Sequence, residues 1–189
     1  LAFEFALKHM DAVNERVDFT SRSQYYPGLA GSSGKAEMIA RVQAYAEQRE
    51  TEVGSAEVYQ LFHDIYLAAN GRWKLGNYQV SRQDGVDRLQ AQLQEGSIMH
   101  TLSGTGNGVV ASFVDAMQGF TGKQIVLVEY NEHALSHSAD AEAICYIQLN
   151  IEGHRYCGVG RSPDIIQASL DGILGAINKA AEREHHAAA

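Results

Sequence analysis

The chain has 189 residues and a formal net charge of −8, and hydrophobic residues make up 45% of it. This length is enough to bury a hydrophobic core, in one domain or in one domain with a helical appendage. The acidic balance and the lack of a long basic run argue against nucleic acids and anionic membranes as partners, and no apolar run approaches the length of a membrane-spanning helix.

The first 70 residues are predicted to form a helical linker or subdomain. Apolar residues recur at helical spacing over residues 3–17, and the segment around Pro27 then breaks the pattern and is the best linker candidate. Two further helices are predicted over residues 35–49 and 55–69, the second with Ser55 as its N-cap. These two helices are expected to form a helical hairpin. Residues 31–35 resemble a phosphate-binding loop but lack its first glycine and its Ser or Thr, which argues against that function.

From Arg72 onward the hydrophobic period changes from that of a helix to that of a strand. Strands are predicted over residues 73–80, 86–93 and 97–102, with polar turns between them. In the second strand, apolar residues from Leu89 to Leu93 alternate with charged or amide residues, so the sheet should have one covered face and one wet face.

A glycine-rich turn, Gly104 to Gly108, follows the third strand and is expected to allow positive φ and the close approach of another backbone or a small ligand. A helix is predicted to start near Asn107. One of its faces carries Val110, Phe113, Val114 and Met117.

The same order of elements then returns. Strands are predicted over residues 125–130, 143–151 and 155–159, and Gly158-Val159-Gly160 follows. The second helix should open with Ser162 as its cap and Pro163 in its first turn. It is expected to bury Ile166, Leu170, Ile173, Leu174 and Ile177. Cys145 and Cys157 lie in these strands without a CxxC spacing, and are interpreted as reduced thiols in a cytoplasmic protein.

The pattern therefore predicts an α+β fold, with the N-terminal helical segment followed by two pseudo-twofold βββα units. The repeats span about residues 72–120 and 123–183 of a domain at 71–183, and residues 184–189 are interpreted as a probable tail. The two Gly-x-Gly turns should approach each other. A pocket floored by backbone amides at two helix N-termini would suit a carboxylate.

Three segments carry a family resemblance: SGTGNGVVASFVDAM, VEYNEHALSHSADAEAICYIQL and YCGVGRSPDIIQASLDGILGAINKAA. They resemble the C-terminal regulatory domain of 2-isopropylmalate synthase, over roughly residues 55–181. The resemblance implies an allosteric homodimerisation domain that binds leucine for feedback inhibition of leucine biosynthesis. It also implies that the chemistry belongs to a separate catalytic barrel with a divalent metal. The chain alone is therefore expected to be an inactive fragment of an acyltransferase, without a cofactor or catalytic residues of its own.

The resemblance also places the family's leucine-pocket lining on residues of this chain. These residues are Asn107, Gly108, Val110, Ala111, Leu127, Tyr130, Ala134, Ala141, Gly160 and Pro163. Two neighbours depart from the family pattern: Val109 stands where proline is common, and Arg161 stands where a small or apolar residue is common. The Arg161 guanidinium could bind a carboxylate or block the socket.

Several alternatives remain open at this level. One is a structural dimerisation module that has lost its effector site, and another is the isoleucine-responsive domain of a citramalate synthase. An independent enzyme ranks last. Its candidate residues would be His133, His137 and Asp140, as metal ligands or, with Ser136, as a nucleophilic site, but their spacing favours hydrogen bonding within a loop.

Overall fold

The computed structural model describes residues 33–49, 53–67, 71–134 and 142–187. The predicted helix over residues 3–17 and the linker around Pro27 lie outside these ranges. The described elements are α4 (Ser33–Arg49), α5 (Ser55–Phe62), the π-helical turn η2 (His63–Leu67), β1 (Lys74–Gln83), β2 (Val86–Glu95), β3 (Ile98–Gly106), α6 (Val109–Thr121), β4 (Ile125–Ala134), β5 (Ala143–Ile151), β6 (His154–Ser162) and α7 (Ile165–Ala187).

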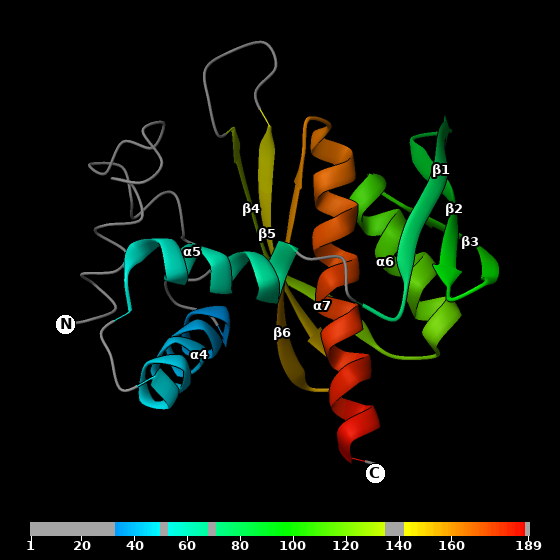
Figure 1. Ribbon diagram of the computed structural model, residues 1–189. Coiled ribbons are helices and arrows are strands. Elements are labelled where there is room, and N and C mark those ends of the chain that lie inside the picture. Colours follow the sequence, from blue (N-terminus) through cyan, green and yellow to red (C-terminus); the bar gives the residue numbers. More distant parts are fainter. Residues whose placement is uncertain (1–32, 50–52, 68–70, 135–141, 188–189) are drawn as a thin grey trace.

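The elements form layers around two helices (Figure 1). Strands β1, β2 and β3 make one antiparallel sheet, and β4, β5 and β6 make a second, each in sequence order. Helices α6 and α7 lie between the two sheets, while α4 and α5 lie on the outer side of the second sheet. The α+β prediction with two βββα units after N-terminal helices is confirmed.

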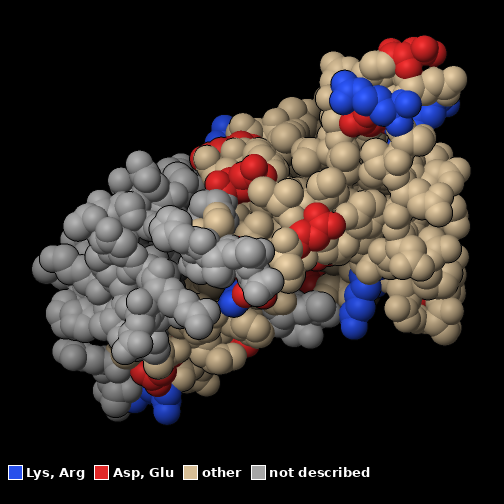
Figure 2. All heavy atoms as spheres, turned by 90° about the horizontal axis from the view of Figure 1, so that it is seen from above, with Lys and Arg blue, Asp and Glu red and all other residues tan. Residues whose placement is uncertain are grey.

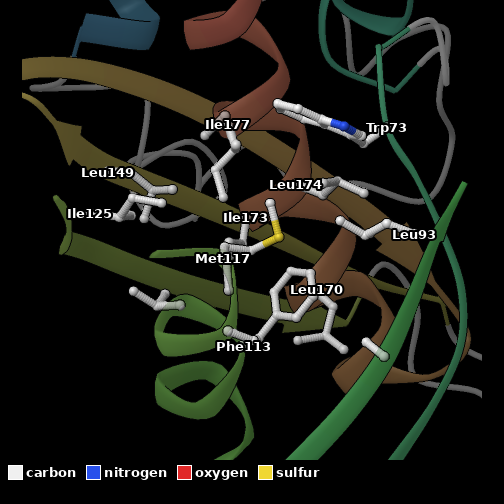
Figure 3. Packing of buried hydrophobic residues seen from close by; sticks show 14 of the residues in the cluster. Trp73, Leu93, Phe113, Met117, Ile125, Leu149, Leu170, Ile173, Leu174 and Ile177 are labelled. Carbon is white, nitrogen blue, oxygen red and sulfur yellow. The ribbon is translucent and has the colours of Figure 1, made fainter. Parts of the chain in front are cut away.

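The main core fills the space between the sheets. Figure 3 shows Phe113 and Met117 of α6 meeting Leu170 and Ile173 of α7, all of them almost completely buried. The inner face of β2 supplies Leu89, Ala91 and Leu93, while the residues between them are exposed, as the alternation predicted. Burial of these side chains is the main source of stability, at about 1.5–3 kcal/mol for each large one.

A second, smaller core joins α4 and α5 to the outer face of the second sheet. These two helices, together with η2, which continues α5, form the helix pair. Ile144, Tyr146 and Cys157 pack against side chains of the helix pair that include Val58 and Phe62. Strand β5 is consequently covered on both faces, so almost all of its residues are buried in succession. This double burial explains why the sequence of β5 is a continuous apolar run instead of an alternating one.

The Gly-x-Gly segments have a different conformation from the predicted turns. Gly104 and Gly106 belong to β3, and Gly158 and Gly160 belong to β6. Among the described glycines, those with positive φ occur elsewhere, at residues 85, 96, 122 and 153. A Cβ on Gly158 or Gly160 would lie 1.9 Å from the Gly172 carbonyl oxygen or 1.8 Å from that of Ala168. The glycines therefore allow each unit's own helix to lie directly on its sheet.

Both predicted N-caps are displaced by one or two residues. Gly54, not Ser55, precedes α5, and its N–H donates to the Glu57 carboxylate over 2.9 Å. Ser162 ends β6, and Asp164 caps α7 by accepting a hydrogen bond of 2.8 Å from the Ile166 N–H. An aspartate carboxylate also complements the positive end of the helix dipole. Residues 184–187, interpreted as part of a tail, continue α7.

Substitution of Gly160 tests the close contact between α7 and β6. Gly160→Ala should lower the free energy of unfolding by about 1–3 kcal/mol or more, because its methyl group would overlap backbone atoms that cannot rotate away. Urea denaturation measures this change. Gly119→Ala is the control, since no atom lies within 4 Å of its Cβ position on α6. Equal midpoints for Gly160→Ala and the unmodified chain would contradict the packing.

Burial of Cys157 makes stability depend on pH. Burial raises the pKa of its thiol from 9.0 to about 12. Between these values the unfolded chain loses a proton that the folded chain keeps. The free energy of unfolding should therefore fall as pH rises above 9, by at most about 1.4 kcal/mol per pH unit for this group. Denaturation between about pH 8 and pH 10 measures the slope. Cys157→Ala should make it shallower, and an unchanged slope would contradict the assignment.

Candidate functional site

A cavity of about 620 Å³ lies where α6 and α7 begin, beside β4. Its volume is within the range of about 300–1,000 Å³ that is usual for small-molecule sites. The N-terminal turns of both helices form part of the cavity wall. It is lined by Asn107, Gly108, Val109, Val110, Ala111, Val114, Asp115, Gln118, Leu127, Tyr130, Ile165, Ile166 and Ser169.

The first turn of α6 lies at this cavity, and no side chain caps it. The first intrahelical bond runs from the Ser112 N–H to the Gly108 carbonyl over 2.9 Å, and Gly108 provides no side-chain cap. The amides of residues 109–111 therefore have no acceptor within the helix. Gly108 itself is extended, with φ 165°, and no atom lies within 4 Å of its Cβ position. The two helix N-termini differ, because Asp164 already caps α7.

One carboxylate completes the polar part of the lining. Asp115 lies one turn after Ala111, and its Oδ2 accepts a hydrogen bond of 2.8 Å from the Thr105 N–H. No Lys or Arg occurs among the described residues that line the cavity. Figure 2 looks onto the end of the molecule where both helices begin, and most of its central surface consists of uncharged residues, with separate acidic and basic residues among and beside them. An anionic group in the cavity would therefore depend on the backbone amides.

The opposite wall is apolar and partly open to solvent. Leu127 of β4 is 37% exposed, and Ile165 and Ile166 of α7 are 42% and 38% exposed. The sequence prediction that α7 buries Ile166 is thus wrong for this chain by itself. Val126 and Val128 beside Leu127 are also exposed, and β4 is an edge strand of its sheet. Exposed apolar residues at the cavity rim and along a free strand edge are typical of a contact site.

Hydroxyl groups form the inner end of the cavity. The Tyr130 hydroxyl contacts the Glu132 carboxylate and lies 3.0 Å from Ser169 Oγ, which in turn donates to the Ile165 carbonyl over 2.7 Å. Cys145 Sγ lies 3.4 Å from the same Ser169 oxygen. Burial raises the pKa values of both Tyr130 and Cys145, and the neighbouring Glu132 adds to both shifts. Both groups are therefore neutral at physiological pH and act through hydrogen bonds.

The structure brings together six of the ten residues suggested by the resemblance: Asn107, Gly108, Val110, Ala111, Leu127 and Tyr130. The exposed Ala134 ends β4 outside the cavity lining, and the exposed Pro163 precedes α7 without lining it. Gly160 lines a different cleft, of about 910 Å³, between α7, β6 and the helix pair. Ala141 lies outside the described residues.

Arg161 does not reach the candidate cavity. Its Nε donates to Glu142 over 2.7 Å and its Nη1 donates to the Tyr59 hydroxyl over 3.2 Å, in the larger cleft. These contacts raise the pKa of the guanidinium against the opposing effect of its burial. Arg161 therefore holds the helix pair to β6 instead of binding or blocking a ligand among the lining residues.

Sequence reasoning missed part of the lining. Of its apolar residues, Val114 and Ile166 were expected in helix packing, Val109 only as a departure from the family pattern, and Ile165 had no predicted role. Asp115 and Gln118 follow Ala111 at spacings of four and seven residues, so extending the helical face of Ala111 identifies both. Ser169 shows no comparable local signal, because only the packing of α7 against β4 brings it to Tyr130.

The described residues contain no group of three or more His, Cys, Asp or Glu side chains that could hold a metal ion. His137 and Asp140 of the metal hypothesis lie outside the described ranges. In the part of the chain that the structure describes, no helix is both long and apolar enough to cross a membrane.

Comparison with known proteins agrees with this architecture. Residues 52–181 match the family model of the LeuA allosteric (dimerisation) domain. The chain is similar to 2-isopropylmalate synthase of Kineococcus radiotolerans, with 36% identity over 146 residues, and to that of Thermobifida fusca, with 32% identity over 139 residues. The 2-isopropylmalate synthase of Acetoanaerobium sticklandii is 30% identical over 142 residues. The chain belongs to the LeuA allosteric (dimerisation) domain family.

The match covers a small part of each relative. It spans 74% of this chain but 25% of the Kineococcus protein and 24% of the Thermobifida protein. The chain thus corresponds to about a quarter of the length of these curated relatives.

Proposed function

We propose that this chain is the regulatory region of a 2-isopropylmalate synthase and that its cavity between α6 and α7 binds leucine as a feedback inhibitor. The observation that carries the proposal is the combination, in one cavity, of a helix N-terminus without a side-chain cap, a single carboxylate and an apolar wall. A free aliphatic amino acid carries the complementary groups: a carboxylate, an ammonium group and a branched apolar side chain. The family membership supports the same function.

Each part of the ligand has a partner in the lining. The leucine carboxylate would accept hydrogen bonds from the amides of residues 109–111, where the helix dipole also favours negative charge. The ammonium group would pair with Asp115, whose position is held by the Thr105 N–H. The side chain would pack against Val110, Leu127 and Ile166.

A second copy of the chain would close the open side of the cavity. The apolar residues at its rim, Leu127, Ile165 and Ile166, are more than a third exposed, and the edge strand β4 adds Val126 and Val128. A symmetric contact would bury the same patch on both copies. The proposed assembly is therefore a homodimer in which leucine is enclosed at or near the contact.

The alternative of a structural module without an effector site rested on Arg161, and the contacts of Arg161 with Glu142 and Tyr59 remove that reason. The citramalate synthase alternative differs in its effector, isoleucine, as well as in the enzyme that the domain would regulate. Isoleucine is therefore included as a second ligand in the binding measurement.

Calorimetry with leucine, isoleucine and valine tests the site. Leucine should bind the unmodified chain and raise its melting temperature by linkage. Gly108→Val should fold normally, because its extended backbone and open surroundings accept a side chain, but should weaken leucine binding at least tenfold by filling the cavity.

Gly119→Val is the matched control for this measurement. It places the same side chain in open space on α6 but outside the cavity lining, so leucine binding should stay unchanged. Normal leucine binding by a folded Gly108→Val chain would disprove the site, and a preference for isoleucine would reassign the effector.

Asp115→Asn tests the proposed ammonium partner. The amide oxygen of asparagine can still accept from the Thr105 N–H, so the fold should be kept while the negative charge is lost. Loss of a charged hydrogen bond of about 1.5–3 kcal/mol should weaken leucine binding roughly 10- to 100-fold in calorimetry. Unchanged affinity would remove Asp115 from the site.

Light scattering tests the assembly. The chain should have the mass of a dimer without ligand, and Leu127→Asp should shift it toward the monomer, because a carboxylate would be desolvated in the contact. Leucine should tighten any monomer–dimer equilibrium if it is enclosed between the copies. A monomer at micromolar concentration, with a mass unaffected by leucine, would contradict the proposed contact.

A further inference from the structure

Two consecutive residues of α7 make contacts on two sides. Asn178 contacts residues 71–73, which lead from the helix pair into the first sheet, and Lys179 contacts the helix pair itself. Asn178 accepts a hydrogen bond from the Trp73 N–H and donates one to the Trp73 carbonyl, both over 2.9 Å. A Cβ on Gly71 would lie 2.1 Å from Asn178 Nδ2, so the chain passes directly over this side chain. Asn178 is 8% exposed, and both Trp73 and Gly71 belong to the segment that leads into β1.

Lys179 makes the corresponding contact with the helix pair. Its Nζ lies 2.8 Å from Glu37 Oε2 of α4 and 3.6 Å from the centre of the Tyr66 ring in η2. The Tyr66 hydroxyl donates to the same Glu37 oxygen over 2.9 Å. The side chains of Lys179 and Glu37 are 18% and 31% exposed, so water screens this pair less than an open surface pair. Three elements thus meet at one shared carboxylate oxygen.

The opposite end of α7 belongs to the candidate cavity. Ile165, Ile166 and Ser169 line the cavity, and Lys179 follows Ser169 by ten residues, about 15 Å further along the helix. Ala168, beside Ser169, and Gly172, further along the helix, lie directly on the glycines of β6. Such close packing leaves little room for bending, so α7 and β6 should move as one rigid body.

We infer that Lys179 is a positioning residue that couples the candidate cavity to the helix pair. A ligand in contact with the first turn of α7 would determine, through Lys179, how α4, α5 and η2 pack against α7. Asn178 anchors residues 71–73 beside this contact. This inference rests on the proposed function and identifies how that cavity regulates the rest of the chain. A ligand that stabilises one position of α7 therefore also stabilises the position of the helix pair in which Lys179 contacts Glu37 and Tyr66. The coupling is reciprocal, so docking of the helix pair also affects ligand affinity.

Hydrogen–deuterium exchange of the whole chain, with and without saturating leucine, tests this coupling. In the unmodified chain, leucine should slow exchange both in peptides from the cavity, residues 109–118 and 165–170, and in peptides from the helix pair, residues 37–49 and 55–67. Lys179→Met removes the charge but keeps most of the apolar stem. In this variant leucine should still protect the cavity peptides, while protection of the helix pair should fall by at least half.

Two further variants complete the experiment. Glu37→Gln keeps an acceptor for Tyr66, should reproduce the loss of coupling and serves if Lys179→Met folds poorly. Lys123→Met removes the ion pair between Lys123 and Glu184, which also involves α7 but does not contact the helix pair, and should leave all protection unchanged.

The outcomes separate this inference from the proposed function. Full helix-pair protection in both Lys179→Met and Glu37→Gln, or cavity protection that never reaches the helix pair in the unmodified chain, would overturn the inference alone. An unmodified chain in which leucine protects neither region would overturn both.

Discussion

The direct contact of α7 with β6 is the constraint on which the rest of the structure depends. Gly158 and Gly160 leave no side chain between the strand and the carbonyl groups of Gly172 and Ala168. The helix therefore lies deep enough to present Leu170, Ile173 and Ile177 to the core between the sheets. With a larger residue in place of Gly158 or Gly160, the helix would move outward and these contacts would be lost together.

The first βββα unit uses the same device. A Cβ on Gly104 would lie 2.2 Å from the Ser112 carbonyl oxygen, so α6 lies on β3 as α7 lies on β6. Because both helices follow directly from the glycine-containing strands, their first turns emerge at the same end of the molecule. The candidate cavity is thus a consequence of the repeat: neither unit contains it, and it forms where the two helix starts meet β4.

The two units have nevertheless diverged at this end. Asp164 caps α7, whereas Gly108 leaves the first amides of α6 without a side-chain partner. The chain therefore places a carboxylate at the N-terminus of α7 but no side-chain cap at the N-terminus of α6. For the proposed ligand, this asymmetry would favour one orientation, with its anionic group toward α6. Asn178 and Lys179 lie further along α7, so a single helix connects the cavity with the contacts of the helix pair.

The sequence by itself determined the local elements and their repetition. Alternation around Leu89 and the helical stripe through Phe113 depend only on the periods of strand and helix, which are local properties of the backbone. Six of the ten pocket residues suggested by the family resemblance lie together for the same reason, since most of them share the start of α6 or the strand β4.

Only the tertiary structure decided which face of each element meets which neighbour. Gly160 and Arg161 are adjacent in sequence, yet the position of a Cβ on Gly160 points at α7 while the Arg161 side chain reaches Tyr59 of the helix pair. Ile166 belongs to an apolar stripe but lies beyond the edge of the core, at the rim of the cavity. Successive strand residues face opposite sides, and the layer that covers each side comes from residues distant in the chain. Local periodicity contains no information about that layer, so Ser169 meets Tyr130 and Lys179 meets Glu37 only through the packing of α7.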